Sequence, residues 1–334
     1  MSNQTPIVSV VIIGRNEGDR LTRCIESVNA MRQPGGPVEV IYVDSDSTDD
    51  SRVRAEALGA KVIVVHPERP SAATGRNAGW QVAKAPIILF LDGDTILHPD
   101  FVVESLPEFM DKKVAVVWGH RRELHPEASI YNRVLDLDWV YPPGPSEFCG
   151  GDALMRRDVL EQLGGMDATL IAGEEPELCR RIRAQAYTIL HVDRQMTGHD
   201  LAMTRWRQYW RRSFRAGHAY AEVAQRFMGT DMPLWKHEVK RNLIHGLALI
   251  LVPFAGVIVS LLFQSWLPLA VVGALIGALV VRTAMRVGWK DNNPLNRLLY
   301  AVHSHLQQIP ILCGQLGYRL DQRYGRQRRL IEYH

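Results

Sequence analysis

Short apolar runs alternate with segments of helical periodicity along the first hundred residues of this chain. The run at residues 8–13 is rich in β-branched side chains and stops at Gly14, which is typical of a strand. In the segment that follows, Leu21, Ile25 and Val28 recur at helical spacing. By the same criteria we predict strands at residues 38–43, 61–65 and 87–91, and helices at residues 19–31, 49–58 and 74–83. Alternating strands and helices indicate an α/β fold with a mixed, mostly parallel sheet flanked by helices.

The pattern is less regular between residues 114 and 200. Residues 114–118 predict another strand, and the Pro-Pro-Gly-Pro run at residues 142–145 indicates a loop. Short helices are expected at residues 158–163 and 177–184. We expect these elements to complete one α/β domain that spans residues 1–230.

Two long apolar runs follow, at residues 244–263 and 266–281, joined by a tight link. A membrane-spanning helix needs about 20 apolar residues, a length that the first run reaches and the second falls short of. Lys and Arg residues flank both sides of the pair, which favours cytoplasmic ends. We therefore predict a membrane hairpin within residues 231–290, in the cell (inner) membrane, with the α/β domain on the cytoplasmic side. A buried helical hairpin of a soluble protein is the alternative.

The C-terminal segment, residues 291–334, is predicted to be amphipathic and basic. Apolar residues such as Leu298, Val302 and Leu306 alternate with His and Gln along residues 295–320. This stretch either lies flat in the membrane interface or packs on the hairpin, and both readings stay open. The arginines at positions 326, 328 and 329 are not interleaved with aromatic residues, so no nucleic-acid partner is expected.

Charge divides the chain into two parts. Residues 201–334 hold 18 Lys and Arg against 6 Asp and Glu, whereas residues 1–200 hold 21 against 30. A basic segment beside apolar runs suits an anionic membrane surface. The four cysteines are widely spaced, so neither a zinc site nor a disulfide framework is expected, and a reducing compartment is favoured. The first residues lack the pattern of a secretory signal.

Two carboxylates follow the most apolar of the predicted strands. Asp92 and Asp94 are two residues apart, so in an extended chain their side chains point the same way. Gly93 between them allows a ligand to approach the backbone closely. Such oxygen ligands suit Mg²⁺ or Mn²⁺ bound to a nucleotide diphosphate. Other polar residues lie just past the ends of neighbouring strands, where ligands of such sheets bind: Asn16, Asp44 and Asp46.

Four motifs occur in an order that resembles a known family. They are residues 8–17 (VSVVIIGRNE), 43–49 (VDSDSTD), 75–79 (GRNAG) and 90–94 (FLDGD). Together they look like the successive signatures of family 2 glycosyltransferases of the GT-A fold, over about residues 7–220. The resemblance implies transfer of a sugar from a nucleotide-sugar donor, usually with inversion at the anomeric carbon.

The resemblance also implies roles for residues that would bind the donor. Asp44 and Asp46 are similar in place to the acidic group that reads the nucleobase and ribose, with Asn16 and Glu17 nearby in the first motif. Asp46 stands where the family usually has glycine, so which aspartate reads the base stays open. Arg76, near a predicted helix start, would contact the diphosphate.

Further residues match the catalytic and metal positions of the family. Glu175, in the run at residues 173–178 (GEEPEL), is similar in place to the catalytic base, and Glu174 remains a candidate because the family usually has Asp there. Such a base takes the proton of the acceptor hydroxyl. His199 resembles a histidine that completes the metal shell beside Asp94 in related enzymes.

Arg211 and Arg215 are four residues apart and are expected to share one helix face. They would neutralise the leaving diphosphate or contact lipid headgroups, and both roles stay open. The run from Gln208 to Arg211 resembles the Gln-x-x-Arg-Trp element of processive family members, but Arg212 replaces the tryptophan. This departure argues against processive polymerisation.

The expected function is a membrane-tethered glycosyltransferase with a divalent metal and a lipid or lipid-linked acceptor. A nucleotidyltransferase of similar fold is one alternative, and a non-catalytic membrane scaffold or sugar-nucleotide sensor is another. A dinucleotide-binding oxidoreductase is not expected, because no GxGxxG follows the first strand.

Overall fold

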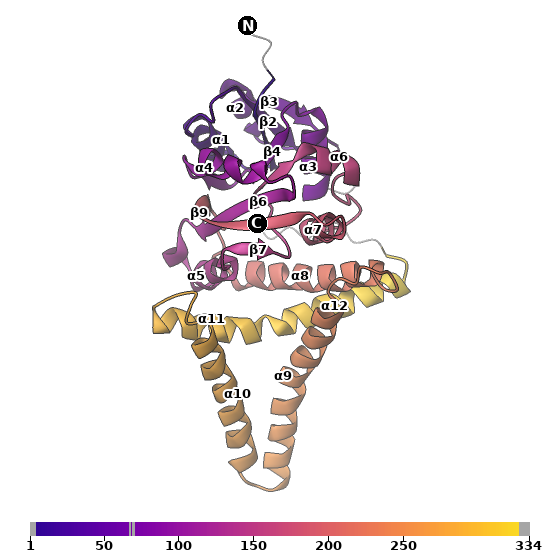
Figure 1. Cartoon of the computed structure of the whole chain (residues 1–334). Helices are drawn as coiled ribbons and strands as arrows, with labels where there is room; N and C mark the ends of the chain where they lie inside the picture. Colours follow the sequence, from indigo (N-terminus) through magenta and orange to yellow (C-terminus); the bar gives the residue numbers. More distant parts are fainter. Residues whose placement is uncertain (1–4, 67, 69–70, 327–334) are drawn as a thin grey trace. The chain divides into compact units, whose positions relative to one another are not determined.

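The computed structural model describes residues 5–66, 68 and 71–326 of the chain (Figure 1). The chain forms two compact units. The sheet unit consists of Met1–Leu124 and Trp139–Leu201, and the helical unit consists of His125–Asp138 and Ala202–His334. The domain bounds predicted from the sequence, near residues 230 and 290, divide the chain by expected function, whereas the two units are divided by compactness. Those predicted bounds stay predictions.

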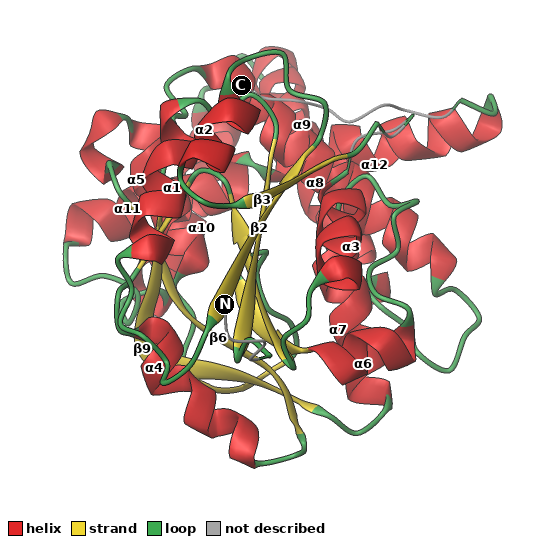
Figure 2. Ribbon diagram, turned by 90° about the horizontal axis from the view of Figure 1, so that it is seen from above, coloured by secondary structure: helices red, strands yellow, loops and turns green. Residues whose placement is uncertain are grey.

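The first half of the sheet unit follows the alternation predicted from sequence. Its strands pair in parallel in the order β3-β2-β1-β4, and helices cover both faces, with α1 on one side and α3 on the other (Figure 2). The elements are β1 (Val8–Gly14), α1 (Asp19–Asn29), β2 (Val38–Asp44), α2 (Ser51–Ala57), β3 (Lys61–Val64), α3 (Ala72–Val82) and β4 (Ile87–Asp92). Each lies within two or three residues of its predicted bounds.

The second half of the sheet contains strands that the sequence pattern did not predict. Among the described residues the sheet has nine strands, and β8, β6, β9 and β5 extend it beyond β4 while β7 pairs with β9. Antiparallel pairings enter here, so the sheet is mixed as expected. The elements are β5 (Thr95–Leu97), α4 (Phe101–Ser105), η1 (Leu106–Met110), β6 (Val114–Glu123), β7 (Gly144–Ser146), β8 (Ala153–Arg156), α6 (Arg157–Leu163), α7 (Glu174–Ala184) and β9 (Thr188–His199).

Three of these elements differ from the predictions for a physical reason. β6 continues to Glu123, past the apolar stretch, because its polar end is paired with β9. The loop expected at residues 142–145 overlaps β7, a short strand whose one proline, Pro145, is tolerated because β7 pairs only with β9 among the described strands. β9 was missed because it is half polar and does not alternate cleanly.

The register of the strands determines which polar residues meet. Ile13 of β1 lies opposite Asp92 of β4, and Gly14 lies opposite Asp44 of β2. β5 begins directly after Asp94 and pairs antiparallel with the end of β9, which sets Thr95 opposite His199. The end of β9 therefore lies beside the two aspartates, although it is distant in sequence.

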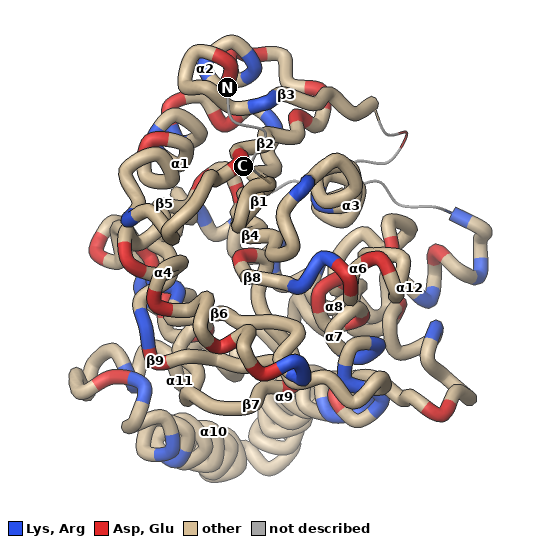
Figure 3. The backbone as a smooth tube through the Cα atoms, turned by 45° about the horizontal axis from the view of Figure 1, so that its top comes forward, with Lys and Arg blue, Asp and Glu red and all other residues tan. Residues whose placement is uncertain are grey.

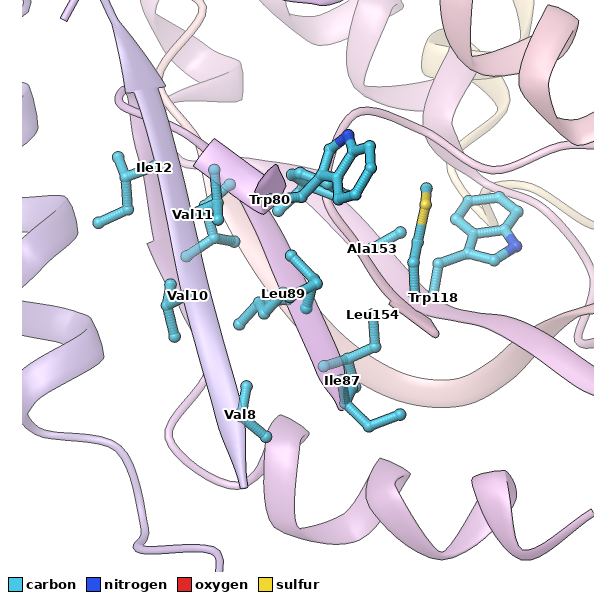
Figure 4. Packing of buried hydrophobic residues seen from close by; sticks show 14 of the residues in the cluster. Val8, Val10, Val11, Ile12, Trp80, Ile87, Leu89, Trp118, Ala153 and Leu154 are labelled. Atoms are coloured by element: carbon cyan, nitrogen blue, oxygen red, sulfur yellow. The ribbon is translucent and has the colours of Figure 1, made fainter. Parts of the chain in front are cut away.

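The core of the sheet unit is built from the β-branched residues of the central strands and the helices that cover them. Figure 4 shows Val11 of β1 and Trp80 of α3 among these packed side chains. A Cβ atom at Gly79 would lie 2.2 Å from Cγ1 of Val11 and 3.1 Å from Cγ2 of Val43. Only glycine allows α3 to approach the sheet this closely.

The helical unit is dominated by long helices. Its elements are η2 (Pro126–Ala128), α5 (Ile130–Asp136), α8 (Trp206–Arg226), α9 (Lys236–Leu262), α10 (Leu267–Arg286), α11 (Pro294–Leu306) and α12 (Gln308–Arg323), while η3 (Leu137–Trp139) connects the two units. A Cβ atom at Gly217 of α8 would lie 2.0 Å from the main-chain oxygen of Ile311 in α12. Glycine thus permits backbone-to-backbone packing of α8 and α12.

α9 and α10 contain the two predicted apolar runs. Among the described helices, these two are long and apolar enough to cross a membrane, by length and composition alone. Their tube is mostly tan in Figure 3, because charged residues are confined to their outer ends. Most of their large apolar side chains are exposed, including Leu275 at 58%.

The amphipathic segment forms two helices, with a break at Gln307. Pro310 lacks a backbone N–H and is tolerated in the first turn of α12, so the chain starts a new helix there. One face of this pair packs on the hairpin helices, and an apolar stripe along α11 remains exposed: Leu295, Leu298, Val302 and Leu306. Arg326 lies just past α12, and Arg328 and Arg329 are outside the described residues.

The glycine at the interface between α3 and the sheet generates a prediction. Gly79→Val should lower the free energy of unfolding by about 1–3 kcal/mol, because the added methyl groups overlap Val11 in a packed core. Thermal unfolding of purified protein measures this change. Gln81→Val introduces the same side chain on the exposed face of the same helix and should change stability by less than about 0.5 kcal/mol. Equal effects of the two substitutions would contradict the packing argument.

Candidate active site

The ends of β4 and β9 bring together Asp92, Asp94 and His199. One ligand atom from each lies within 4.8 Å of the others, and His199 Nε2 is 3.3 Å from Asp94 Oδ2. The other oxygen of Asp94, Oδ1, is buried and has no hydrogen-bond partner among the described residues. Two carboxylates and an imidazole with a buried, unsatisfied oxygen suit a divalent cation such as Mg²⁺ or Mn²⁺. The three residues predicted for the metal therefore meet at one point.

The electrostatics of Asp94 agree with this interpretation. Burial, together with the carboxylates of Asp92 and Glu17, raises the pKa of the Asp94 carboxyl well above its usual value. Carboxylates that crowd in this way favour either a proton or a cation between them. Gly93 relieves crowding here, because a Cβ atom would make tight contacts of 3.1 Å with both the main-chain oxygen of Ile13 and the Glu17 side chain.

Arg76 occupies the other side of Asp92. Its guanidinium is 2.7 Å from Asp92 Oδ1, 3.0 Å from Glu175 Oε1 and 3.3 Å from Glu174 Oε1. Its side chain is only 2% exposed. Burial by itself lowers the pKa of Arg76, but Asp92, Glu175 and Glu174 outweigh burial and raise it above the usual value. Arg76 thus holds the strand end and the start of α7 together.

The surroundings of Arg76 restrict what it can contact. α3 begins at Ala72, two residues before the predicted start, so Arg76 lies in the second helical turn. A Cβ atom at Gly151 would lie 2.3 Å from Arg76 Nη2, so any larger residue there would displace the Arg76 guanidinium. The predicted contact of Arg76 with the donor diphosphate stays a prediction.

The two candidate bases differ in access. Both glutamates stand in the first turn of α7, where the helix dipole favours anions. The side chain of Glu174 is 5% exposed and that of Glu175 is 18% exposed. Glu175 is therefore the more accessible of the two, and its role as the base stays a prediction.

The structure separates the two aspartates of the second motif. Asp44 is fully buried and accepts hydrogen bonds from the backbone N–H of Ser47, from Arg52 Nε and from the Tyr42 hydroxyl. Burial raises its pKa, but these hydrogen bonds outweigh burial and hold the pKa below the ordinary value. Asp46 has a left-handed backbone (φ 65°) and an exposed side chain. Of the two, Asp46 is placed to meet a ligand from solvent.

Asn16 and Glu17 shape the loop after β1. Asn16 Oδ1 accepts the backbone N–H of Thr48 at 2.8 Å, which ties this loop to the one after β2. Glu17 forms an ion pair with Arg20 at 3.0 Å, and burial raises its pKa. The Glu17 side chain also lies close to Gly93, so Glu17 borders the candidate site.

Arg211 and Arg215 lie on α8 of the helical unit. Their predicted contact with the donor diphosphate, or with lipid headgroups, stays a prediction.

The structure adds residues that the sequence reading missed. The guanidinium of Arg121 lies over the ring of Trp139, 4.8 Å from its centroid, and Nη2 is 3.6 Å from Asp92 Oδ2. The Trp139 ring is 5.0 Å from the ring of His199. Asp152 is buried directly beside Asp92. Arg121 was missed because the predicted strand stopped at residue 118, and Asp152 because β8 was not predicted.

Comparison with known proteins agrees with the motif order. Residues 9–164 match the family model described as Glycosyl transferase family 2. Glycosyltransferase AglE of Haloferax volcanii is 23% identical over 198 residues, covering 57% of this chain and 65% of AglE. The pre-mycofactocin glycosyltransferase of Mycobacterium tuberculosis is 27% identical over 250 residues, covering 68% of this chain and 49% of the relative. The chain thus spans less than two thirds of the length of these two curated relatives.

Solved structures show the same fold. The mannosyltransferase PcManGT of Pyrobaculum calidifontis, solved with GDP-Man and Mn²⁺, is 16% identical with a TM-score of 0.60, covering 96% of this chain and 89% of that one. Residues 1–349 of S. aureus TarS are 16% identical with a TM-score of 0.52, covering 96% and 93%. Residues 9–164 therefore match the family 2 glycosyltransferases, and the chain has the GT-A fold.

Proposed function

We propose that this protein is a membrane-tethered glycosyltransferase that transfers a sugar from a UDP- or GDP-sugar to a lipid acceptor, with inversion. One observation carries the proposal: the group of Asp92, Asp94 and His199 is joined through Arg76 to Glu175. A site for a nucleotide diphosphate and a candidate base therefore share one rigid framework. The solved complex of the mannosyltransferase with GDP-Man and Mn²⁺ supports the same kind of donor and ion here.

One set of residues would stabilise the leaving group, and another would activate the acceptor. Asp92, Asp94 and His199 would hold Mg²⁺ or Mn²⁺, which when bound neutralises the charge of the leaving diphosphate. Asp46, with Asn16 and Glu17 at the neighbouring strand end, would hold the nucleoside.

Glu175 would take the proton of an acceptor hydroxyl as that oxygen attacks the anomeric carbon. Attack from the face opposite the leaving nucleotide inverts configuration. Glu174 is more buried, and we assign it to orienting Arg76. An acceptor that is already an anionic phosphate would need no base.

The helical unit supports a membrane location. Its exposed apolar helices α9 and α10 carry basic residues at their outer ends, such as Lys240, Arg241 and Arg286, which favours both ends on the cytoplasmic side of the cell membrane. The exposed apolar stripe of α11 suits the membrane interface. A protein held at the bilayer in this way is suited to a lipid or lipid-linked acceptor.

The first prediction tests the metal group. Asp94→Asn should lower transfer by roughly 100-fold or more, about 3 kcal/mol of transition-state stabilisation, because a charged ligand of the ion is lost. Release of nucleoside diphosphate is measured with purified protein, Mn²⁺ or Mg²⁺, a panel of UDP- and GDP-sugars and a lipid extract. Asp193→Asn, which changes a surface carboxylate of β9, the strand that carries His199, should leave transfer unchanged.

Two results of this assay would contradict the proposal. Full activity with a chelator present would exclude the metal. Release of pyrophosphate instead of nucleoside diphosphate would identify a nucleotidyltransferase, and failure to bind or turn over any donor would favour a scaffold.

The second prediction concerns the base. With a hydroxyl acceptor, Glu175→Gln should lower kcat about 100-fold to 10,000-fold, while the KM for the donor changes little. Glu174→Gln should have a smaller effect on kcat, because its side chain is less accessible. Steady-state kinetics of the two variants measure the difference. A larger loss of kcat in Glu174→Gln would reverse the assignment.

The third prediction tests the membrane hairpin. Leu275 of α10 is exposed, so replacing it with Arg should not disturb packing within the protein. In a bilayer the same change costs about 2.5–3.5 kcal/mol near the helix centre. Leu275→Arg should therefore reduce the fraction that resists alkaline extraction from membranes, whereas Leu275→Ala should not. Unchanged membrane retention of the Arg variant would argue for a soluble hairpin.

A further inference from the structure

Asp152 is a buried carboxylate that the proposed reaction does not use. It directly precedes β8 and is 0% exposed, so it cannot touch a substrate. A carboxylate without solvent is costly to keep in a protein unless its oxygens have partners. The partners of Asp152 therefore indicate what it does.

Both oxygens of Asp152 contact strands that carry candidate metal ligands. Oδ1 accepts the backbone N–H of Asp92 at 3.0 Å. Oδ2 accepts the hydroxyl of Thr197 at 2.8 Å. Thr197 is two residues before His199 in β9, so their side chains are on the same face of the strand. One side chain thus connects the ligand-bearing ends of β4 and β9.

The sheet itself does not make this connection directly. β8 and β6 lie between β4 and β9 in the strand order. β8 begins at Ala153 and pairs with β6 only at Val116 and Val117. Asp152 therefore lies where the backbone ladder between these strands has ended, and its side chain bridges the gap.

The charge of Asp152 also lies close to the candidate metal ligands. Arg121 Nε is 3.7 Å from Asp152 Oδ2, and Arg121 Nη2 is 3.6 Å from Asp92 Oδ2. As a buried anion, Asp152 offsets the positive charge of Arg121, which would otherwise repel a cation at this point, and its hydrogen bond to the Asp92 backbone limits the movement of that ligand. Partners of this kind behind a metal site commonly change metal affinity 10-fold to 100-fold.

We propose that Asp152 is a positioning residue that holds Asp92 and His199 in the geometry for a divalent cation and strengthens cation binding through its charge. The inference rests on the metal site of the proposed function. Asp152 lies behind that site and takes no direct part in the transfer step or in contact with the donor.

The alternative is that Asp152 only satisfies a buried N–H group. Asp152→Asn separates the two possibilities. The amide oxygen still accepts the Asp92 N–H, and the amide nitrogen can donate to the Thr197 hydroxyl, so the fold keeps its hydrogen bonds while the charge is lost. Thr197→Val is the complementary variant, because it keeps the charge and strand shape but removes one of the contacts.

The experiment measures Mn²⁺ binding by electron paramagnetic resonance on full-length protein in detergent, without donor. Compared with the wild type, Asp152→Asn should bind Mn²⁺ about 10-fold to 100-fold more weakly at an unchanged unfolding temperature. Thr197→Val should bind a few-fold more weakly, on the order of 3-fold to 10-fold, since orientation alone is affected. Asp193→Asn changes a surface residue of β9, the strand of Thr197, and this variant should bind Mn²⁺ as tightly as the wild type.

The outcomes separate this inference from the proposed function. Wild-type affinity in a folded Asp152→Asn overturns the role of Asp152 while leaving the metal site intact. Absence of Mn²⁺ binding in the wild type overturns the metal site itself and the inference with it. Where Asp152→Asn lowers the unfolding temperature, Thr197→Val decides, and wild-type affinity in that variant overturns the positioning role.

Discussion

The candidate active site depends on one buried cation, the guanidinium of Arg76. It contacts carboxylates from two elements far apart in the sequence, Asp92 at the end of β4 and the glutamate pair at the start of α7. Removing one partner of a buried ion pair typically costs about 3–5 kcal/mol, because the remaining charges are left uncompensated. The three acids can therefore be close together in this protein only while Arg76 is between them.

Asp92 transmits that constraint to the metal group. Its Oδ1 pairs with Arg76, and its backbone N–H donates to Asp152. A carboxylate oxygen of Asp92 also lies within 4.8 Å of the ligand atoms of Asp94 and His199. A shift of β4 would disturb both groups at once. Such coupling would suit the proposed transfer, in which the leaving group and the acceptor base must be aligned together to within about an ångström.

A local sequence pattern predicts only some residues of the candidate site. Asp92 and Asp94 stand out because an apolar strand ends at them. Glu175 needed the family resemblance, because the predicted helix began only at residue 177. His199 needed the family resemblance, since β9 has no clean alternation. The apolar runs of α9 and α10 can likewise be read from composition alone, because a long segment without charged residues is suited to lipid or to a protein interior rather than to water.

The amino-acid sequence by itself determined the alternation of strands and helices, the polar strand ends and the apolar hairpin, because each depends on neighbours within a few residues. Only the tertiary structure decided that Asp44 is buried and Asp46 exposed, and that Arg76 pairs with α7. It also decided that Asp152 bridges β4 and β9. The contacts of Arg76 and Asp152 join residues separated by many positions in the chain, and strand pairing and side-chain burial select them rather than any local periodicity.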